Sequence, residues 1–197
     1  MFDIFIIYEN TYKMLGYRNI SATTKKMEKR DLHNQLQIKG FVQIDGKYAD
    51  GEIFICYLVD PNAATLTKKG DFKIIFDAVM NLKSAANVVI IGAAIPNNTV
   101  LKPIQELRVE NPKLYLEVLL YSPLTIEVPK HKMYVAHRAL THEEVVELMK
   151  KIKNANIPVI SAKDPAAIWM GIRSGDIVEI KRKSEISGEL TTYRKCE

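Results

Sequence analysis

Acidic residues beside predicted strands are the first candidates for chemistry, because paired carboxylates can hold the metal ions of a nuclease. Asp50 and Glu52 lie at the start of an apolar, β-rich stretch at 51–59. The next stretch of this kind, 87–92, contains no acidic residue and no ExK pattern. Two-metal hydrolysis requires carboxylates that converge on one site, and the sequence does not supply such a set. A degenerate nuclease-like domain remains one alternative.

Three histidines lie close together in the sequence but not in a metal-binding pattern. His131, His137 and His142 are six and five residues apart, across a predicted strand and a predicted helix start. Zinc ligands come in tighter pairs, so we interpret these histidines as structural or surface residues. Gly92 belongs to no glycine-rich phosphate loop, and no serine lies in a recognisable triad pattern. We expect no catalytic residue, metal, cofactor or small-molecule substrate.

The two cysteines show no disulfide or thiolate-metal pattern. Cys56 lies in an apolar run, which is typical of a buried free thiol. Cys196 is the penultimate residue, and we expect it to lie on a mobile tail. No CxxC pair is present.

Composition indicates a folded protein, and its charge is compatible with a polyanion nearby or with a solvated surface. The chain has 197 residues, of which 47% are hydrophobic and 26% charged, and its net charge is +5. Residues 128–197 contain 13 basic and 9 acidic residues, so most of the positive charge lies in this part. The charge is modest for a free-standing nucleic-acid-binding protein, which is the second alternative.

The beginning of the chain lacks the pattern of a secretion signal. It has no basic start, and Asp3 and Glu9 interrupt its apolar residues. No apolar run approaches the roughly 18 residues that a membrane span needs. We expect an intracellular protein without a membrane partner.

The first part of the chain alternates helical and strand patterns. Apolar residues at 71–83 recur at three and four positions, which predicts an amphipathic helix. The apolar runs at 51–59 and 87–92 predict strands buried on both faces. This order predicts an α/β domain with a mixed sheet flanked by helices. We expect helices at 2–15, 22–38, 71–83 and about 97–109, and strands at 51–59, 87–92 and 114–120.

The last part predicts a small, self-contained α+β domain. Thr141 and Glu144 have the spacing of a capping box, and Asp164-Pro165 is a second helix start. The residues at 176–182 alternate as a half-exposed strand, and 190–194 returns as its partner. A further short strand is expected at 134–137. The predicted domains are therefore 1–127 and 128–197, with Trp169 in the core or at an interface.

Specific motifs carry a family resemblance in this last part. They are Ile157-Pro158-Val159-Ile160, Lys163-Asp164-Pro165-Ala166, Gly171-Ile172-Arg173-Ser174-Gly175-Asp176-Ile177-Val178, Ile180-Lys181-Arg182-Lys183-Ser184-Glu185, Gly188 and Thr192-Tyr193-Arg194. Their order and spacing over about seventy residues resemble the shared fifth-largest subunit of eukaryotic nuclear RNA polymerases and its archaeal counterpart. His131, His137 and the capping box fall where that family has paired histidines and an acidic helix start.

The first part resembles the jaw domain of the eukaryotic form of this family. Met14-Leu15-Gly16-Tyr17 matches the end of its first helix, and Val88-Val89-Ile90-Ile91 matches its central strand. Ile95-Pro96-Asn97-Asn98 falls where the family begins a helix with a Thr-Pro-Ser-Ala-like segment. Val135 and Lys183 stand where the family commonly has proline. The chain is also shorter than nuclear examples, which suits the polymerase of a large DNA virus or of a divergent protist.

The resemblance implies a non-catalytic subunit of a DNA-directed RNA polymerase. Its partners would be the largest subunit, the other subunits and downstream duplex DNA held by the jaw during transcription. It would work in the nucleus if cellular, and in a cytoplasmic viral factory or a virion if viral. The residues expected near DNA phosphates, at a helix start, are Pro96, Asn97, Asn98, Thr99 and Lys102. Those expected to contact other subunits or shape the domain are His131, His137, Asp164, Pro165, Gly171, Arg173, Gly175, Arg182, Ser184, Gly188, Tyr193 and Arg194.

Overall fold

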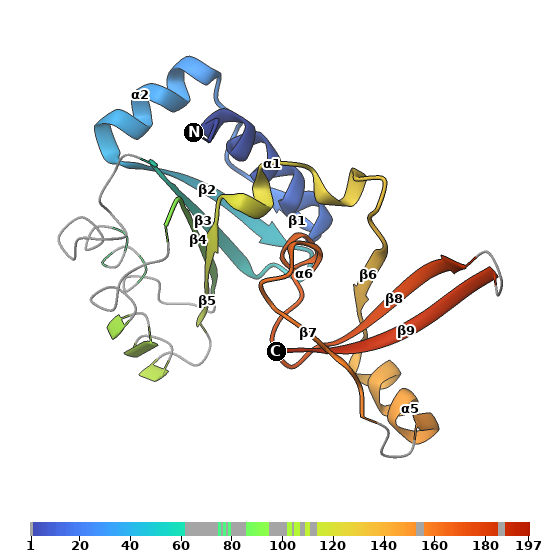
Figure 1. Cartoon of the computed structure of the whole chain (residues 1–197). Helices are drawn as coiled ribbons and strands as arrows, with labels where there is room; N and C mark the ends of the chain where they lie inside the picture. The colour runs from blue at the N-terminus through green and yellow to red at the C-terminus, as the bar shows by residue number, and fades with distance from the viewer. Residues whose placement is uncertain are drawn as a thin grey trace. The chain divides into compact units, whose positions relative to one another are not determined.

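The computed structural model divides the chain into two compact units, Met1–Thr125 and Ile126–Glu197. They are called unit 1 and unit 2 below, and each is described by itself (Figure 1). The structure describes residues 2–61, 75, 77, 79, 86–94, 102–103, 105–106, 109–110, 114–152, 156–184 and 188–197.

Unit 1 is built on a mixed five-stranded sheet in the order β1-β2-β3-β4-β5. The strands β1, β2 and β3 pair antiparallel, whereas β3, β4 and β5 pair parallel. The mixed sheet that the sequence predicted is therefore present. The described elements are α1 (Ile4–Tyr17), β1 (Ile20–Ala22), α2 (Lys29–Lys39), β2 (Phe41–Tyr48), β3 (Ile53–Val59), β4 (Ala86–Gly92), β5 (Leu114–Leu120) and the 3₁₀ turn η2 (Ser122–Leu124).

The central strands of unit 1 are buried on both faces, as their apolar runs predict. Every side chain of β3 from Phe54 to Val59 is buried. On one face, Ile55 and Tyr57 pack in a cluster with the helical residues Ile75 and Val79. On the other face, Arg18, which follows α1, reaches Glu117 of β5. This two-sided cover makes the sheet an inner layer.

The prediction of one helix across 22–38 is wrong at its beginning. Ile20–Ala22 forms β1, and α2 begins only at Lys29. Thr24 accepts a hydrogen bond on its hydroxyl from the backbone N–H of Asp45, at 2.9 Å. The backbone N–H of Thr23 also donates to the Asp45 carbonyl at 2.8 Å. These bonds tie the two threonines to β2, in competition with a helix.

The strand β2 was missed by the sequence prediction, although its burial alternates along the chain. Val42 and Ile44 are fully buried, and their neighbours are partly exposed. Gly46 then lies so close to β1 that an added Cβ would come within 2.8 Å of Ile20. The glycine thus permits the close approach of β1 and β2.

Unit 2 contains a four-stranded sheet in the order β6-β8-β9-β7. The pairs β6–β8 and β8–β9 are antiparallel, and β7 pairs parallel with β9. The described elements are the 3₁₀ turn η3 (Val128–Lys130), β6 (Ala136–Ala139), α5 (His142–Ile152), β7 (Val159–Ile160), α6 (Pro165–Met170), β8 (Ile177–Ser184) and β9 (Gly188–Cys196). The strand expected at 134–137 is thus β6, two residues further along, and β7 was not predicted.

The two helices described in unit 2, α5 and α6, begin as their cap residues predict. Thr141 accepts a bond from the Glu144 amide at 3.3 Å, and the Glu144 carboxylate accepts one from the Thr141 amide at 2.8 Å. Asp164 accepts from the Ala166 amide at 2.8 Å, with Pro165 at the first helical position. These bonds satisfy amides that a helix start leaves without partners.

The core of unit 2 includes the chain's last cysteine. Cys196 is fully buried and packs with Val178, Ile180 and Ala167. The prediction of a mobile tail is therefore wrong. The backbone of Cys196 explains why, since its N–H donates to the Asp176 carbonyl at 2.8 Å and its carbonyl accepts from Gly175 at 2.9 Å. Cys56 is buried in unit 1, as predicted.

Candidate functional site

The predicted DNA-proximal residues fall largely where the structure gives no description. Pro96, Asn97, Asn98 and Thr99 lie outside the described residues. Lys102 is described, and it is exposed on helical backbone. An exposed lysine of this kind can reach a phosphate.

Asp164 and Gly171 fix the two ends of α6, the short helix of unit 2. Asp164 caps its start, and Gly171 ends it in the left-handed conformation at φ 67°. The Gly171 amide donates back to the Ile168 carbonyl at 3.2 Å. Trp169 lies between these two helix ends and is completely buried. The Asp164, Pro165 and Gly171 positions therefore determine how Trp169 is held in the core.

Arg173 and Gly175 lie in the turn that leads from α6 into β8. The Arg173 amide donates to the Asp176 carboxylate at 2.7 Å. Gly175 has φ 98°, a conformation that favours glycine, and its amide donates to the Cys196 carbonyl at 2.9 Å. This turn therefore ties the start of β8 to the end of β9.

The hairpin of β8 and β9 brings together the remaining predicted residues of unit 2. Arg182 pairs in register with Leu190, and Ser184 with Gly188. Tyr193 lies opposite Glu179, and Arg194 opposite Val178. In Figure 1 β8 and β9 are drawn as two long arrows side by side, at the red end of the colour scale.

Alternation along the hairpin assigns its two faces. Val178, Ile180 and Arg182 alternate on β8, so they share a face, and their partners on β9 include Leu190 and Arg194. Val178 and Ile180 are buried, whereas Arg182 is exposed and Leu190 is 47% exposed. This row of side chains therefore begins with the buried Val178 and Ile180 and ends with the exposed Arg182 and Leu190. Arg194 lies opposite Val178.

The two predicted histidines of unit 2 lie before and within β6. His131 is exposed, and its Nδ1 accepts from the Met133 amide at 3.2 Å. His137 is half-buried, its Nδ1 faces the Val135 carbonyl, and its ring centroid is 5.8 Å from that of Tyr134. Both rings take part in local turn contacts. Within the described ranges, no three His, Cys, Asp or Glu side chains gather closely enough to hold a metal ion.

Arg138 is a charged residue that sequence reasoning missed. Its guanidinium contacts Glu144 of α5 at 2.8 Å and Glu179 of β8 at 3.1 Å. The Arg138 hydrogen bond, followed by the Thr141 amide, lowers the pKa of Glu144 from 4.5 to about 2. The hydrogen bonds to Glu144 and Glu179 in turn raise the pKa of Arg138. The alternation of β6 could have placed Arg138 opposite Glu179, but its contact with α5 depends on tertiary packing.

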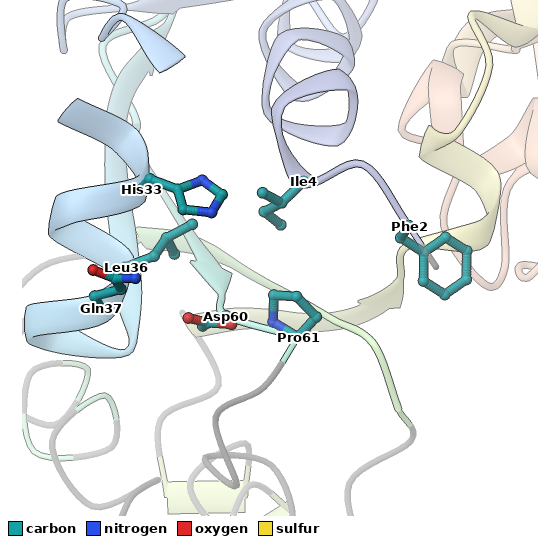
Figure 2. Close-up of a pocket in the computed structure, with 7 residues that line it drawn as sticks. All are labelled: Phe2, Ile4, His33, Leu36, Gln37, Asp60 and Pro61. Carbon is teal, nitrogen blue, oxygen red and sulfur yellow. The ribbon is translucent and has the colours of Figure 1, made fainter. Parts of the chain in front are cut away.

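Unit 1 contains a cavity of about 200 Å³ with a mainly apolar lining (Figure 2). His33 and Asp60 are polar members of the lining, and they come from α2 and from the residue after β3. This lining suits an apolar side chain better than a phosphate. The remaining lining residues are Phe2, Ile4, Leu36, Gln37 and Pro61.

The acidic residues weighed for a nuclease make local contacts in the structure. Asp50 accepts from the Glu52 amide at 3.0 Å, and Glu52 accepts from the side-chain amide of Asn87 at 2.9 Å. The Asp50 carboxylate therefore holds the turn between β2 and β3, and the Glu52 carboxylate ties this turn to β4. No helix of the described part of the chain is long and apolar enough to cross a bilayer.

Comparisons with known proteins show which family unit 2 resembles. Residues 126–196, almost the whole of unit 2, match the RNA polymerase Rpb5, C-terminal domain family. Unit 2 is therefore similar to the C-terminal domain of the Rpb5 subunit of DNA-directed RNA polymerases.

Relatives with this name extend the similarity to unit 1. The DNA-directed RNA polymerase RPB5 homolog of African swine fever virus, strain Badajoz 1971 Vero-adapted, is 24% identical over 193 residues. That alignment covers 95% of this chain and 94% of the viral protein. The RPABC1 subunit of RNA polymerases I, II and III from Caenorhabditis briggsae is 38% identical over 85 residues, or 42% of this chain and 40% of that subunit. The family resemblance found in the sequence is confirmed, and a viral version is consistent with these relatives.

Proposed function

We propose that this chain is a non-catalytic subunit of a multisubunit RNA polymerase, in which unit 2 serves assembly and unit 1 forms part of a jaw around downstream DNA. The observation that carries the proposal is a similarity spanning 95% of the chain to proteins named RPB5 homologs. A second support is the Rpb5 C-terminal domain at 126–196. Its partners would be the largest subunit and the other polymerase subunits.

The geometry of unit 2 supports an assembly role. Its α6 helix is fixed by a cap at each end, and its turn at Gly175 is bonded to the last strand. On the hairpin of β8 and β9, the exposed Arg182 and the half-buried Arg194 share one face. Guanidinium groups suit pairing with carboxylates of a neighbouring subunit.

The DNA-holding role of unit 1 concerns the segment 96–102. Free amides at a helix start favour a phosphate, and Lys102 can add a salt-dependent contact. Such contacts would position the duplex without reading its sequence. Photo-crosslinking from a probe at residue 102 in a transcribing complex should label downstream DNA, and an absence of labelled DNA would contradict the jaw role.

Co-purification tests the proposal as a whole. A tagged chain expressed in its natural host should elute with a very large polymerase that contains the catalytic subunits. Elution of the tagged chain by itself, without these subunits, would contradict the proposed function. The same preparation locates the complex, which we expect in the nucleus of a cellular host or in a viral factory or virion.

A further inference from the structure

The strand β9 has a long edge that the described part of the chain leaves without a partner strand. On one side, β9 pairs with β8 along its whole length, from Gly188 to Lys195. On its other side, β7 covers only Lys195 and Cys196. The segment 188–194 therefore forms an open edge within the described residues.

The hydrogen bonds at the base of β9 show which backbone groups face this open edge. The Cys196 amide donates to Asp176, on the β8 side, whereas the Lys195 amide donates to the Pro158 carbonyl, on the β7 side. The amide and carbonyl of one residue point to the same side of a strand, and the side alternates at each residue. Thr191 and Tyr193 therefore direct their backbone groups to the open edge, as Lys195 does.

Pro158, the residue before β7, explains why β7 begins only at Val159. In the parallel register of Val159 with Lys195, the backbone amide of residue 158 would donate to the Tyr193 carbonyl. Proline has no N–H, so this bond cannot form and the ladder stops. The open edge is thus a consequence of the proline that directly precedes β7.

The open edge has side chains that suit an acidic partner. Arg182 and Arg194 share one face of the hairpin, and the half-exposed Leu190 lies on the same face, directly opposite Arg182. Lys181 and Lys183, on the opposite face, are exposed as well. Among the described hairpin residues at 181–184 and 188–191, Glu189 is the one carboxylate. An extended segment that carries carboxylates and an apolar side chain complements this pattern.

We propose that the open edge of β9 accepts an extended, acidic segment of another polymerase subunit as an additional strand. The segment bonds to the backbone of Thr191 and Tyr193, places an apolar side chain beside Leu190 and pairs its carboxylates with the hairpin cations. This inference rests on the proposed function, because it specifies how unit 2 binds within the polymerase.

The sharpest test removes a single outward backbone donor. Thr191→Pro deletes the amide that faces the open edge and leaves the bonds between β8 and β9, which are made by the neighbouring residues. Proline is tolerated at such edge positions. Thr191→Val is the matched control, because it changes the side chain and keeps the amide. The full-length variants are co-expressed with the polymerase, purified by a tag on this chain and compared by the amount of catalytic subunit retained.

The expected result is that Thr191→Pro retains about tenfold less catalytic subunit than Thr191→Val, with unchanged far-ultraviolet circular dichroism. Equal retention by Thr191→Pro and wild type would overturn the inference while leaving the proposed function in place. Failure of wild type itself to retain polymerase would remove the proposed function, and the inference with it.

A second variant tests the chemistry of the partner. Arg182→Glu with Lys183→Glu should also lower retention of the catalytic subunit, because the incoming carboxylates would meet like charge. If this double variant lost binding to a DNA duplex but retained the polymerase normally, the hairpin cations would serve nucleic acid. That result would overturn the inference.

Discussion

Arg138 connects a helix start to a strand through charge. Its contacts with Glu144 and Glu179 lie at the surface, where each ion pair is screened by water. Their main effect is instead to lower the pKa of Glu144. Because its pKa is lowered in the folded state, Glu144 stabilises unit 2 fully above pH 4.5, and this contribution is lost as pH falls toward 2.

We predict that Arg138→Ala raises the pKa of Glu144 from about 2 toward 4.5, because the largest cause of the shift is removed. The acid-induced loss of stability should then begin at a higher pH. Carboxyl chemical shifts followed by NMR titration measure the pKa directly. Arg182→Ala is the control, since Arg182 makes no ion pair with another described residue, and an unchanged Glu144 pKa in Arg138→Ala would contradict the interpretation.

Both cysteine thiols should be protected from chemical modification in the native protein. Burial raises the pKa of Cys56 to about 12 and also raises that of Cys196, so neither forms much thiolate near neutral pH. We expect both to react with a thiol reagent at least about a hundredfold more slowly in buffer than in denaturant. Mass spectrometry of the labelled peptides separates the two sites. Rapid native labelling at Cys196 would show that the end of β9 frays.

Elements with strong local signals were the ones that the sequence predicted well. The caps at Thr141 and Asp164 reach three and two residues along the chain, so they can be identified without knowing the fold. The short strands β1 and β7 depend on partners far away in the sequence, as Ile20 depends on Tyr48 and Val159 on Lys195. The residue patterns therefore predicted α5 and α6 but missed β1 and β7.

The residues of the candidate site also differ in whether the sequence alone could predict their roles. The turn and cap roles of Asp164, Gly171 and Gly175 follow from residue type and spacing, and the structure places them accordingly. The contact of Arg138 with α5 could not be read from the sequence, because it depends on how α5 packs on the sheet. The positions of Arg182 and Arg194 on one face required the register of β8 and β9.

The cap of α6 should contribute measurably to the stability of unit 2. Asp164→Ala removes the bond to the Ala166 amide, and we expect the free energy of unfolding to fall by ~1 kcal/mol. Asp164→Asn preserves an acceptor at this position and should cost much less. Urea denaturation followed by circular dichroism gives both values. Equal stability of Asp164→Ala and wild type would show that water replaces the cap without cost.

At the scale of the whole molecule, each unit has its own sheet and its own core. Because unit 2 coincides with the matched family domain, changes on its surface should affect assembly without disturbing unit 1. Charge reversal at the exposed hairpin cations should therefore affect assembly while leaving folding unchanged.

We predict that Arg182→Glu combined with Arg194→Glu weakens co-purification with the largest subunit more than it lowers stability. Arg182 is exposed, so its reversal should change unfolding by less than about 0.5 kcal/mol. Arg194 also donates to the Val159 carbonyl at 3.2 Å, so Arg194→Gln serves as the control for that bond. Unchanged co-purification of the double variant would count against assembly through this face.

The complete burial of Trp169 has a practical consequence, because this is the chain's single tryptophan. Its indole emission, excited selectively over tyrosine, comes from unit 2 alone and shifts to the red when water reaches the ring. The nine tyrosines are distributed over both units, so circular dichroism and tyrosine signals report on the entire chain. Comparing the two signals during one titration would reveal whether the polymerase-family domain melts together with the rest of the protein or independently of it.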